Sequence, residues 1–349
     1  MEFFGKEIEK WFDEYGRDLP WRKTKDPYLI WISEVILQQT RVVQGFDYYM
    51  KFKTRFPNVE ALASAEEDEV LKYWQGLGYY SRARNLHAAA KSIQGDFPST
   101  YKEVLALKGV GAYTAAAICS FAYDMPYAVV DGNVYRVLSR YLGISTPIDS
   151  SLGKKEFSDI AQELLDKNNP AKYNQAIMDF GAIQCVPKNP ACEDCPLVDS
   201  CYAYAHQMVS DLPVKKGMVK VRDRYLNFFY IVQGDYTYIE KRVGKDIWQN
   251  LYQLPLIESD RSLPLIELLE KYKTSDIFLK MSRPSIKLIV DDYKHILSHQ
   301  HLHTTFYQIE VDDNYQLADG YLKIKRADLD EYAIPRLIHL FLEKYIVFE

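Results

Sequence analysis

This chain of 349 residues lacks both long apolar runs and a surplus of positive charge. No run of 18 or more apolar residues occurs, so we expect no membrane-spanning helix. Residues 1–10 carry charges and no extended apolar segment, which argues against a signal peptide and favours a cytoplasmic chain. The net charge is −5, whereas nucleic-acid-binding proteins are often basic. This balance excludes little, because affinity for phosphates depends on where individual cations are placed.

Cysteine is also scarce, with five residues in the whole chain. Cys119 stands alone in an apolar segment and is predicted to lie in the core. The remaining four are spaced C-x6-C-x2-C-x5-C: Cys185, Cys192, Cys195 and Cys201. An intracellular chain rarely uses disulfides, so clustered thiols indicate a metal site. Zinc and an iron–sulfur cluster both accept four thiolates, and ligand count alone does not decide between them.

The sequence changes character near residue 213, and its length favours more than one domain. We predict an all-α domain over residues 1–213, a polar and basic linker over 214–224, and an α+β domain over 225–349. Aromatic and β-branched runs at 225–233 and 236–240, separated by Gly234-Asp235, predict a hairpin.

The remaining predicted elements follow from periodicity. Helices are predicted at residues 1–16, 28–44, 46–56, 60–75, 82–93, 101–107, 112–123, 133–142, 152–167, 171–184, 263–272 and 334–346, and further strands at 286–290, 303–311 and 321–325.

Two segments carry candidate chemistry. Gly109-Val110-Gly111 lies between two predicted helices, where glycine permits a tight turn and free amides at the next helix start attract a phosphate. Asp131 stands just before Gly132 and Asn133, at the start of another helix. Elsewhere, Glu34 lies within the predicted helix 28–44, which is apolar on most faces. A carboxylate buried there must be paired, protonated or functional.

Together these features resemble the base-excision DNA glycosylases of the endonuclease III superfamily. The shared features are the helix-hairpin-helix, Val130-Asp131-Gly132-Asn133 and the cysteine spacing. Within that superfamily, Trp31-Ile-Ser-Glu-Val-Ile-Leu-Gln-Gln-Thr40 and Gly76-Leu-Gly-Tyr-Tyr-Ser-Arg82 resemble the MutY family of adenine DNA glycosylases. The resemblance implies a [4Fe–4S] cluster on the four cysteines. It also implies a monomeric enzyme acting on double-stranded DNA with adenine opposite 8-oxoguanine or guanine.

Cleavage of an N-glycosidic bond requires an acid for the leaving base and negative charge near the cationic sugar. Burial should keep Glu34 protonated, which suits the acid. A helix N-terminus should keep Asp131 ionised, which suits a stabiliser or nucleophile at C1′. Tyr113 stands where strand-cleaving relatives place a lysine, so base removal without efficient strand cleavage is expected. By resemblance, Tyr113 hydrogen-bonds around Asp131, and Asn133 orients Asp131 or the water.

The resemblance also implies DNA-contacting residues, because the target base must leave the stack. Gln39 and Tyr79 would be wedges that fill or prop the gap, and Trp21, Arg22 and Leu37 would line the base pocket. The second half resembles a Nudix-type fold but lacks the acidic G-x5-E-x7-R-E-x-x-E-E box, which indicates lesion recognition and not hydrolysis.

Leu297-Ser298-His299 resembles the F-S-H loop with which this family recognises 8-oxoguanine, with leucine in place of phenylalanine. A competing interpretation is that the alternating His299, His301 and His303 share one face of a strand and bind a metal. Two functional alternatives remain. One is another glycosylase of the superfamily, such as a thymine-mismatch enzyme, against which the Glu34 helix and the second half argue. The other is a non-catalytic iron–sulfur DNA-binding protein, against which the retention of Glu34 and Asp131 argues.

Overall fold

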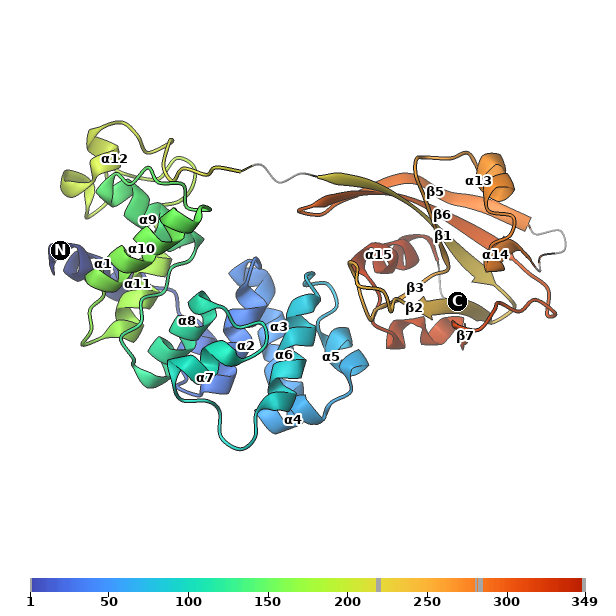
Figure 1. The fold of residues 1–349 in the computed structure, drawn as a ribbon, viewed down its shortest axis with the longest axis horizontal. Coiled ribbons are helices and arrows are strands. Elements are labelled where there is room, and N and C mark those ends of the chain that lie inside the picture. The colour runs from blue at the N-terminus through green and yellow to red at the C-terminus, as the bar shows by residue number, and fades with distance from the viewer. Residues whose placement is uncertain (1, 218–220, 280, 282–284, 347–349) are drawn as a thin grey trace. The chain divides into compact units, whose positions relative to one another are not determined.

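The computed structural model describes residues 2–217, 221–279, 281 and 285–346, and it divides into two compact units (Figure 1). The first unit contains residues Met1–Ser64 and Asn85–Gly217. The second contains Met218–Glu349 together with the helical segment Ala65–Arg84. The predicted linker 214–224 includes residues 218–220, which lie outside the described residues. The domain boundaries expected at residues 213 and 225 stay a prediction.

The first unit is built from helices, as predicted. They are α1 (Glu2–Tyr15), the 3₁₀ helix η1 (Pro20–Arg22), α2 (Pro27–Leu37), α3 (Val42–Arg55), α4 (Val59–Ser64), α6 (Ser81–Ser92, which begins in the second unit), α7 (Tyr101–Ala106), α8 (Ala112–Tyr123), α9 (Gly132–Leu142), α10 (Ser151–Leu164), α11 (Pro170–Ile183), η2 (Val198–Ser200) and α12 (Tyr202–Ala205). The short helix α5 (Glu67–Tyr73) belongs to the second unit.

Two of the predicted helices are wrong in extent. The helix expected over residues 28–44 ends at Leu37, and α3 begins only at Val42. The backbone cannot continue the helix because Gln39 has φ +57°, in the left-handed region. The helix expected over 60–75 is also two helices, since Glu66 is extended and starts α5 anew.

Two groups of helices make up the first unit. In one group, α1, α9 and α11 pack together around buried side chains such as Phe4, Val137 and Phe180. In the other, α2 packs against α3 and α8, and α7 packs against α8 (Figure 1). Helix α11 also contacts α8 and so joins the two groups. The active-site cavity described below draws its walls from both groups.

The second unit contains two sheets. One has the strand order β4-β1-β6-β5, from β4 (Leu256–Ser259), β1 (Arg222–Val232), β6 (Gln300–Glu310) and β5 (Ser285–Ile296). The other has the order β3-β2-β7, from β3 (Tyr252–Gln253), β2 (Tyr236–Lys241) and β7 (Tyr321–Lys325). Helices α13 (Leu265–Lys271), α14 (Asp276–Leu279) and α15 (Arg336–Tyr345) and the 3₁₀ helix η3 (Arg326–Glu331) complete it.

The predicted hairpin of residues 225–240 is wrong in its pairing. Strands β1 and β2 enter different sheets and share a single antiparallel bridge, Gln233 to Tyr236. The longer hairpin is formed by β5 and β6, and residues 297–299 lie at its tip. That hairpin presents the segment predicted to recognise the lesion. Strands β3 and β4 and helix α14 were not predicted, because elements of two to four residues are too short to show a period.

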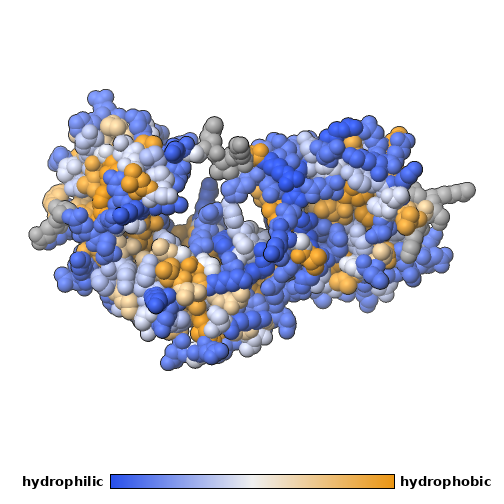
Figure 2. All heavy atoms as spheres, in the orientation of Figure 1, coloured by the Kyte–Doolittle hydropathy of each residue, from blue (hydrophilic) through white to orange (hydrophobic). Residues whose placement is uncertain are grey.

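Across the described residues, no helix is both long and apolar enough to span a bilayer. Figure 2 shows a mostly hydrophilic visible face with separate apolar patches. Some large apolar side chains are exposed, such as Val43 and Leu152, as is usual for protein surfaces.

Candidate active site

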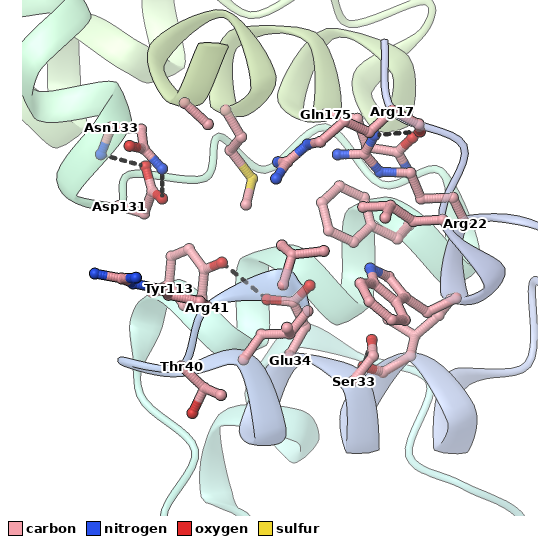
Figure 3. Close-up of a pocket in the computed structure, with 18 of the residues that line it drawn as sticks. Arg17, Arg22, Ser33, Glu34, Thr40, Arg41, Tyr113, Asp131, Asn133 and Gln175 are labelled. Atoms are coloured by element: carbon pink, nitrogen blue, oxygen red, sulfur yellow. Dashed lines mark hydrogen bonds between the residues drawn. The ribbon is translucent and has the colours of Figure 1, made fainter. Parts of the chain in front are cut away.

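A cavity of about 610 Å³ in the first unit gathers all four predicted catalytic residues. Glu34, Tyr113, Asp131 and Asn133 all line it. In Figure 3, Asp131 and Asn133 lie on one side, and Tyr113 lies between them and Glu34. These side chains come from α2, α8 and the start of α9, so segments about 100 residues apart in the chain form one site.

Glu34 is held on a helix that is buried along nearly its whole length. Residues Tyr28 to Ile36 of α2 are all buried, and Glu34 itself is 6% exposed. Burial raises the pKa of Glu34 to about 7, assisted by the nearby Asp131, while the Tyr113 hydrogen bond and Arg22 act against the rise. A carboxyl group with this pKa is protonated in a large share of molecules at neutral pH and can donate a proton.

Tyr113 contacts a different carboxylate from the one predicted. Its hydroxyl donates a hydrogen bond to Glu34 Oε2 at 2.8 Å, and no hydrogen bond joins it to Asp131 among the described residues. Tyr113 lies in the first turn of α8, and this position aims its ring at α2. Burial and the neighbouring Glu34 raise the pKa of Tyr113 well above its usual value, so the hydroxyl keeps its proton and acts as a donor.

Asp131 is the N-terminal cap of α9 and also faces the cavity. Its Oδ1 accepts hydrogen bonds at 2.8 Å from the backbone N–H groups of Asn133 and Val134. Its Oδ2 accepts one at 2.9 Å from the Asn133 side-chain amide, and the predicted role of Asn133 in orienting Asp131 or the water stays a prediction. Burial raises the pKa of Asp131, an effect that helix position alone did not predict, and these three donors oppose the rise.

Arg136, one turn along α9, links Asn133 to the loop that carries the cysteines. It donates hydrogen bonds to Asn133 Oδ1 at 2.9 Å and to the Cys185 carbonyl at 2.7 Å. Another N–H reaches the Gly181 carbonyl at 2.5 Å. Helix α11 can come this close because residue 181 has no Cβ, which would lie 2.7 Å from the Asn133 Cβ. Asn133 is therefore fixed from both sides.

The four cysteines from the sequence pattern line one small cavity with Arg140, Val198 and other residues. Arg140 donates a hydrogen bond to Cys185 Sγ at 3.4 Å and others to the Val186 and Pro187 carbonyls. Within the described part of the chain, no three His, Cys, Asp or Glu side chains are arranged to surround a single metal ion. Four thiols that face one cavity have the donor chemistry of an iron–sulfur cluster or of zinc, so the cavity alone does not decide between them.

The glycine hairpin has the predicted form. Gly109 adopts φ +81°, where a Cβ would also collide with Asn85 at 2.7 Å, so glycine is required. Gly111 is the N-cap residue of α8 and provides no side-chain cap. Val110 between them is buried. The first amides of α8 are thus available for an anion.

The residues predicted to contact DNA fall into three groups. Trp21, Arg22 and Leu37 line the same cavity as Glu34 and Asp131, and their predicted contact with the target base stays a prediction. Gln39 lies just beyond the end of α2, is exposed, and does not line this cavity. Its positive φ is shared by Tyr79, which is 44% exposed and has φ +46°. Such conformations are uncommon for these residue types and often mark functional positions.

The third group lies in the second unit. There Tyr79, Leu297, Ser298 and His299 line a separate cavity of about 540 Å³, and the Tyr79 and Ser298 hydroxyls form a short hydrogen bond. Leu297 is partly buried against the core of this unit. The competing metal interpretation gains no support, because His303 instead hydrogen-bonds Asp292 at 2.9 Å and Asp223 at 3.0 Å.

Sequence reasoning missed several residues that line the cavity or support its walls. Arg17, Arg41, Arg136 and Gln175 line it, and Asp179 holds two of its arginines. A signal existed for Asp179, since it is a carboxylate on the largely buried helix α11, as Glu34 is on α2. Arg17 and Arg41 lie outside helices and give no such signal, and Arg136 is buried on the amphipathic helix α9.

Comparison with known families defines the class. Residues 32–164 match the HhH-GPD superfamily of base excision DNA repair proteins, and residues 185–201 match the iron–sulfur binding domain of endonuclease III. Residues 227–344 match the NUDIX domain. The chain is therefore a base-excision DNA repair enzyme with an iron–sulfur loop and a C-terminal α+β NUDIX domain. The four cysteines are the ligands of the cluster, and all four line one cavity.

Individual relatives narrow this class. The chain is 35% identical over 302 residues to an adenine DNA glycosylase of Buchnera aphidicola, covering 85% of this chain and 83% of that protein. It is 39% identical over 237 residues to the adenine DNA glycosylase of Rattus norvegicus, covering 64% and 46% respectively. A solved thermostable thymine-DNA glycosylase is 32% identical with a TM-score of 0.55, covering 59% of this chain and 96% of that one. The chain belongs to the adenine DNA glycosylase family.

Proposed function

We propose that this adenine DNA glycosylase is monofunctional and acts on adenine opposite 8-oxoguanine or guanine in duplex DNA, with Glu34 as the general acid and Asp131 as the stabiliser or nucleophile. One observation carries the proposal: two carboxyl groups face the same cavity in different environments. Burial raises the pKa of Glu34 to about 7, whereas three hydrogen-bond donors support the charge on Asp131.

The roles follow from these environments. As the C1′–N9 bond breaks, its electron pair leaves with adenine, and Glu34 gives that base a proton. Asp131 carries the negative charge that faces the cationic sugar, either through space or by bonding to C1′. Water then adds to C1′, and the proton it loses restores Glu34. Asn133 keeps Asp131 in place throughout.

Tyr113 supports the monofunctional assignment. A lysine at this position could form a Schiff base with C1′ and lead to strand cleavage, whereas a tyrosine hydroxyl cannot. Here that hydroxyl is already engaged as a donor to Glu34. The residue therefore orients the acid.

Lesion recognition is assigned to the hairpin tip of the second unit. Ser298 and His299 are exposed there beside Tyr79, and they offer hydrogen-bonding groups to a purine edge. Leu297 packs partly into its own core, so it is less available than a free aromatic ring to stack on a base. Recognition here rests on polar contacts.

The iron–sulfur cluster has a structural role in this proposal. When bound, the cluster cross-links the loop of residues 185–201. Arg136 donates hydrogen bonds to both the Cys185 carbonyl and Asn133 Oδ1, so a loop fixed in this way would also fix Asn133.

One assay tests substrate and reaction together. Duplexes with adenine opposite 8-oxoguanine, adenine opposite guanine, or thymine opposite guanine are incubated with enzyme, and each product is divided for alkali treatment. We expect adenine release from the first two, with strand breaks only after alkali. Efficient breaks without alkali would contradict the monofunctional assignment. Activity on thymine alone would overturn the substrate.

A further inference from the structure

Asp179 is a fully buried carboxylate on α11 that belongs to none of the assigned catalytic, DNA-binding or cluster residues. It does not line the active-site cavity, but Arg17 and Arg22, its two partners, do. Its burial among polar partners demands an explanation, since an ionised carboxylate is costly to bury unless it is paired.

The pairing is extensive and directional. Arg22 presents both terminal nitrogens, with Nη1 2.8 Å from Asp179 Oδ2 and Nη2 2.8 Å from Oδ1. Arg17 donates its Nε–H to Oδ1 at 2.9 Å and its backbone N–H to Oδ2 at 3.0 Å, and its Nη2 makes a further short contact. Arg22 Nη1 also donates to the Arg17 carbonyl at 3.0 Å, as Figure 3 shows. A bidentate contact of this kind fixes the plane of a guanidinium group.

The charges in this group do not cancel. Two guanidinium groups face one carboxylate, which leaves one net positive charge beside the cavity. Burial tends to raise the pKa of Asp179, but hydrogen bonds from Arg22 and Arg17 outweigh it and hold that pKa below the usual range. Asp179 therefore stays ionised across the pH range in which the enzyme would work.

This group reaches the chemistry through Arg22. Arg22 acts on Glu34 as a nearby positive charge, in the direction that lowers the pKa of Glu34. The other charged and titratable groups around Glu34 come from separate elements: Tyr113 of α8, Asp131 at the start of α9, and, along the cavity wall, Arg17, Arg41 and Arg136. The position of Arg22 therefore helps to determine the pKa of Glu34.

We propose that Asp179 is a positioning residue for adenine excision: its carboxylate, with Arg17, holds the guanidinium of Arg22 in a fixed orientation at the wall of the base cavity. The proposal rests on the proposed function, in which this cavity holds the target adenine, and its pH dependence rests on the proposed role of Glu34. The orientation itself follows from the hydrogen bonds. Misplacing a side chain that contacts a reacting base by about 1 Å costs about 100-fold in rate.

A double-mutant cycle tests this. Asp179→Asn and Arg22→Gln are each expected to lower the single-turnover rate of adenine release by about 10- to 100-fold. The double variant should be no more than about threefold slower than the slower single variant, because both changes remove the same arrangement. Fully multiplicative losses would show that Asp179 acts independently of Arg22 and would overturn the proposal.

The pH profile provides a readout that a merely structural role would not move. Asp179→Asn removes the charge that offsets Arg22, so the alkaline limb of the rate should shift to lower pH. Arg22→Gln should shift it to higher pH. The matched control is Asp13→Asn. It breaks an exposed ion pair to Lys172, which lies on α11 as Asp179 does, and it should change neither the rate nor the alkaline limb of the pH profile. Unmoved limbs in both test variants would contradict the assignment.

A further variant covers the case in which Asp179→Asn does not fold, since it leaves two partly buried guanidinium groups without their carboxylate. Arg22→Lys retains the charge and leaves the Asp179–Arg17 pairing intact, but loses the bidentate contact. Its adenine release should fall at least about tenfold with little change in melting temperature. A wild-type rate would overturn the proposal. Failure of the proposed function is distinguishable, because Glu34→Gln would then be active while the Asp179–Arg22 coupling persisted.

Discussion

The Tyr113 hydroxyl donates a hydrogen bond to Glu34 Oε2 at 2.8 Å, which ties the residue after the glycine hairpin to the proposed acid. This hydrogen bond stabilises the ionised form of Glu34 and therefore lowers its pKa, against the larger effect of burial. Burial and the Tyr113 hydrogen bond thus act in opposite directions, and the pKa of Glu34 is about 7.

Removal of that hydroxyl should move the balance in a known direction. In Tyr113→Phe the pKa of Glu34 should rise, because burial remains and the stabilising donor is lost. The alkaline limb of single-turnover adenine release should move to higher pH by a fraction of a unit to about one unit. A limb that stays in place or moves to lower pH would show that Tyr113 does not act on Glu34.

Stability should depend on Glu34 in the opposite sense from a carboxylate whose pKa is lowered by folding. Its folded pKa of about 7 exceeds the ordinary 4.5, so its stabilisation is complete below pH 4.5 and is lost as pH rises through 7. The shift corresponds to about 3 kcal/mol. Glu34→Gln, which has no charge to bury, should therefore gain stability relative to wild type as pH rises from 4.5 to 8.

Thermal melting at several pH values measures this difference. Glu163→Gln, at an exposed position of α10, is the control and should show no comparable trend. If the melting difference between Glu34→Gln and wild type were constant across pH, Glu34 would not titrate with a raised pKa.

Asp131→Asn should separate catalysis from binding. The amide keeps the size of the cap and one acceptor oxygen, but removes the charge that faces the sugar. We expect a loss of about 100-fold or more in adenine release with little change in duplex affinity. Asp124→Asn is the control, because Asp124 pairs with Lys25 on the surface and its left-handed backbone (φ +51°) suits asparagine. Equal rates for the two variants would refute the role of Asp131.

Ser298 should affect the choice of opposing base more than the chemistry. Ser298→Ala removes a hydroxyl at the hairpin tip, where Tyr79 is its hydrogen-bond partner. The preference for adenine opposite 8-oxoguanine over adenine opposite guanine should fall about 5- to 20-fold, in line with one lost polar contact of about 1–2 kcal/mol. Competition between the two duplexes measures the ratio, and Ser275→Ala, elsewhere in this unit, is the control. An unchanged ratio would remove Ser298 from recognition.

The sequence predicted the helical character of the first unit because its apolar residues recur at helical spacing over long segments. It failed where a single backbone conformation decides the outcome. Gln39 has a positive φ, so α2 ends before it, and a glutamine side chain does not predict such a backbone conformation. Strand pairing failed for the same reason, since Gly234-Asp235 marks a reversal but does not show that β1 and β2 enter different sheets.

The candidate site was predictable where one residue alone carries the argument. Glu34 stood out as a charge on an apolar helix, and Asp131 as a helix cap. Contacts between distant segments could not be predicted from the sequence. Tyr113 was predicted to hydrogen-bond around Asp131, but its hydroxyl donates to Glu34. The ion pair of Asp179 with Arg22 joins residues 157 positions apart. Burial of Asp131 likewise depends on α11, which the local sequence around residue 131 does not specify.

The central claim, that Glu34 is the acid for adenine departure, is tested most directly by single-turnover adenine release from an adenine:8-oxoguanine duplex across pH 5–9. For wild type, the rate should fall about tenfold per pH unit above the pKa near 7. Glu34→Gln should be at least about 100-fold slower near neutral pH and should lack that alkaline fall. A Glu34→Gln rate within a few-fold of wild type, with the same pH profile, would contradict the account.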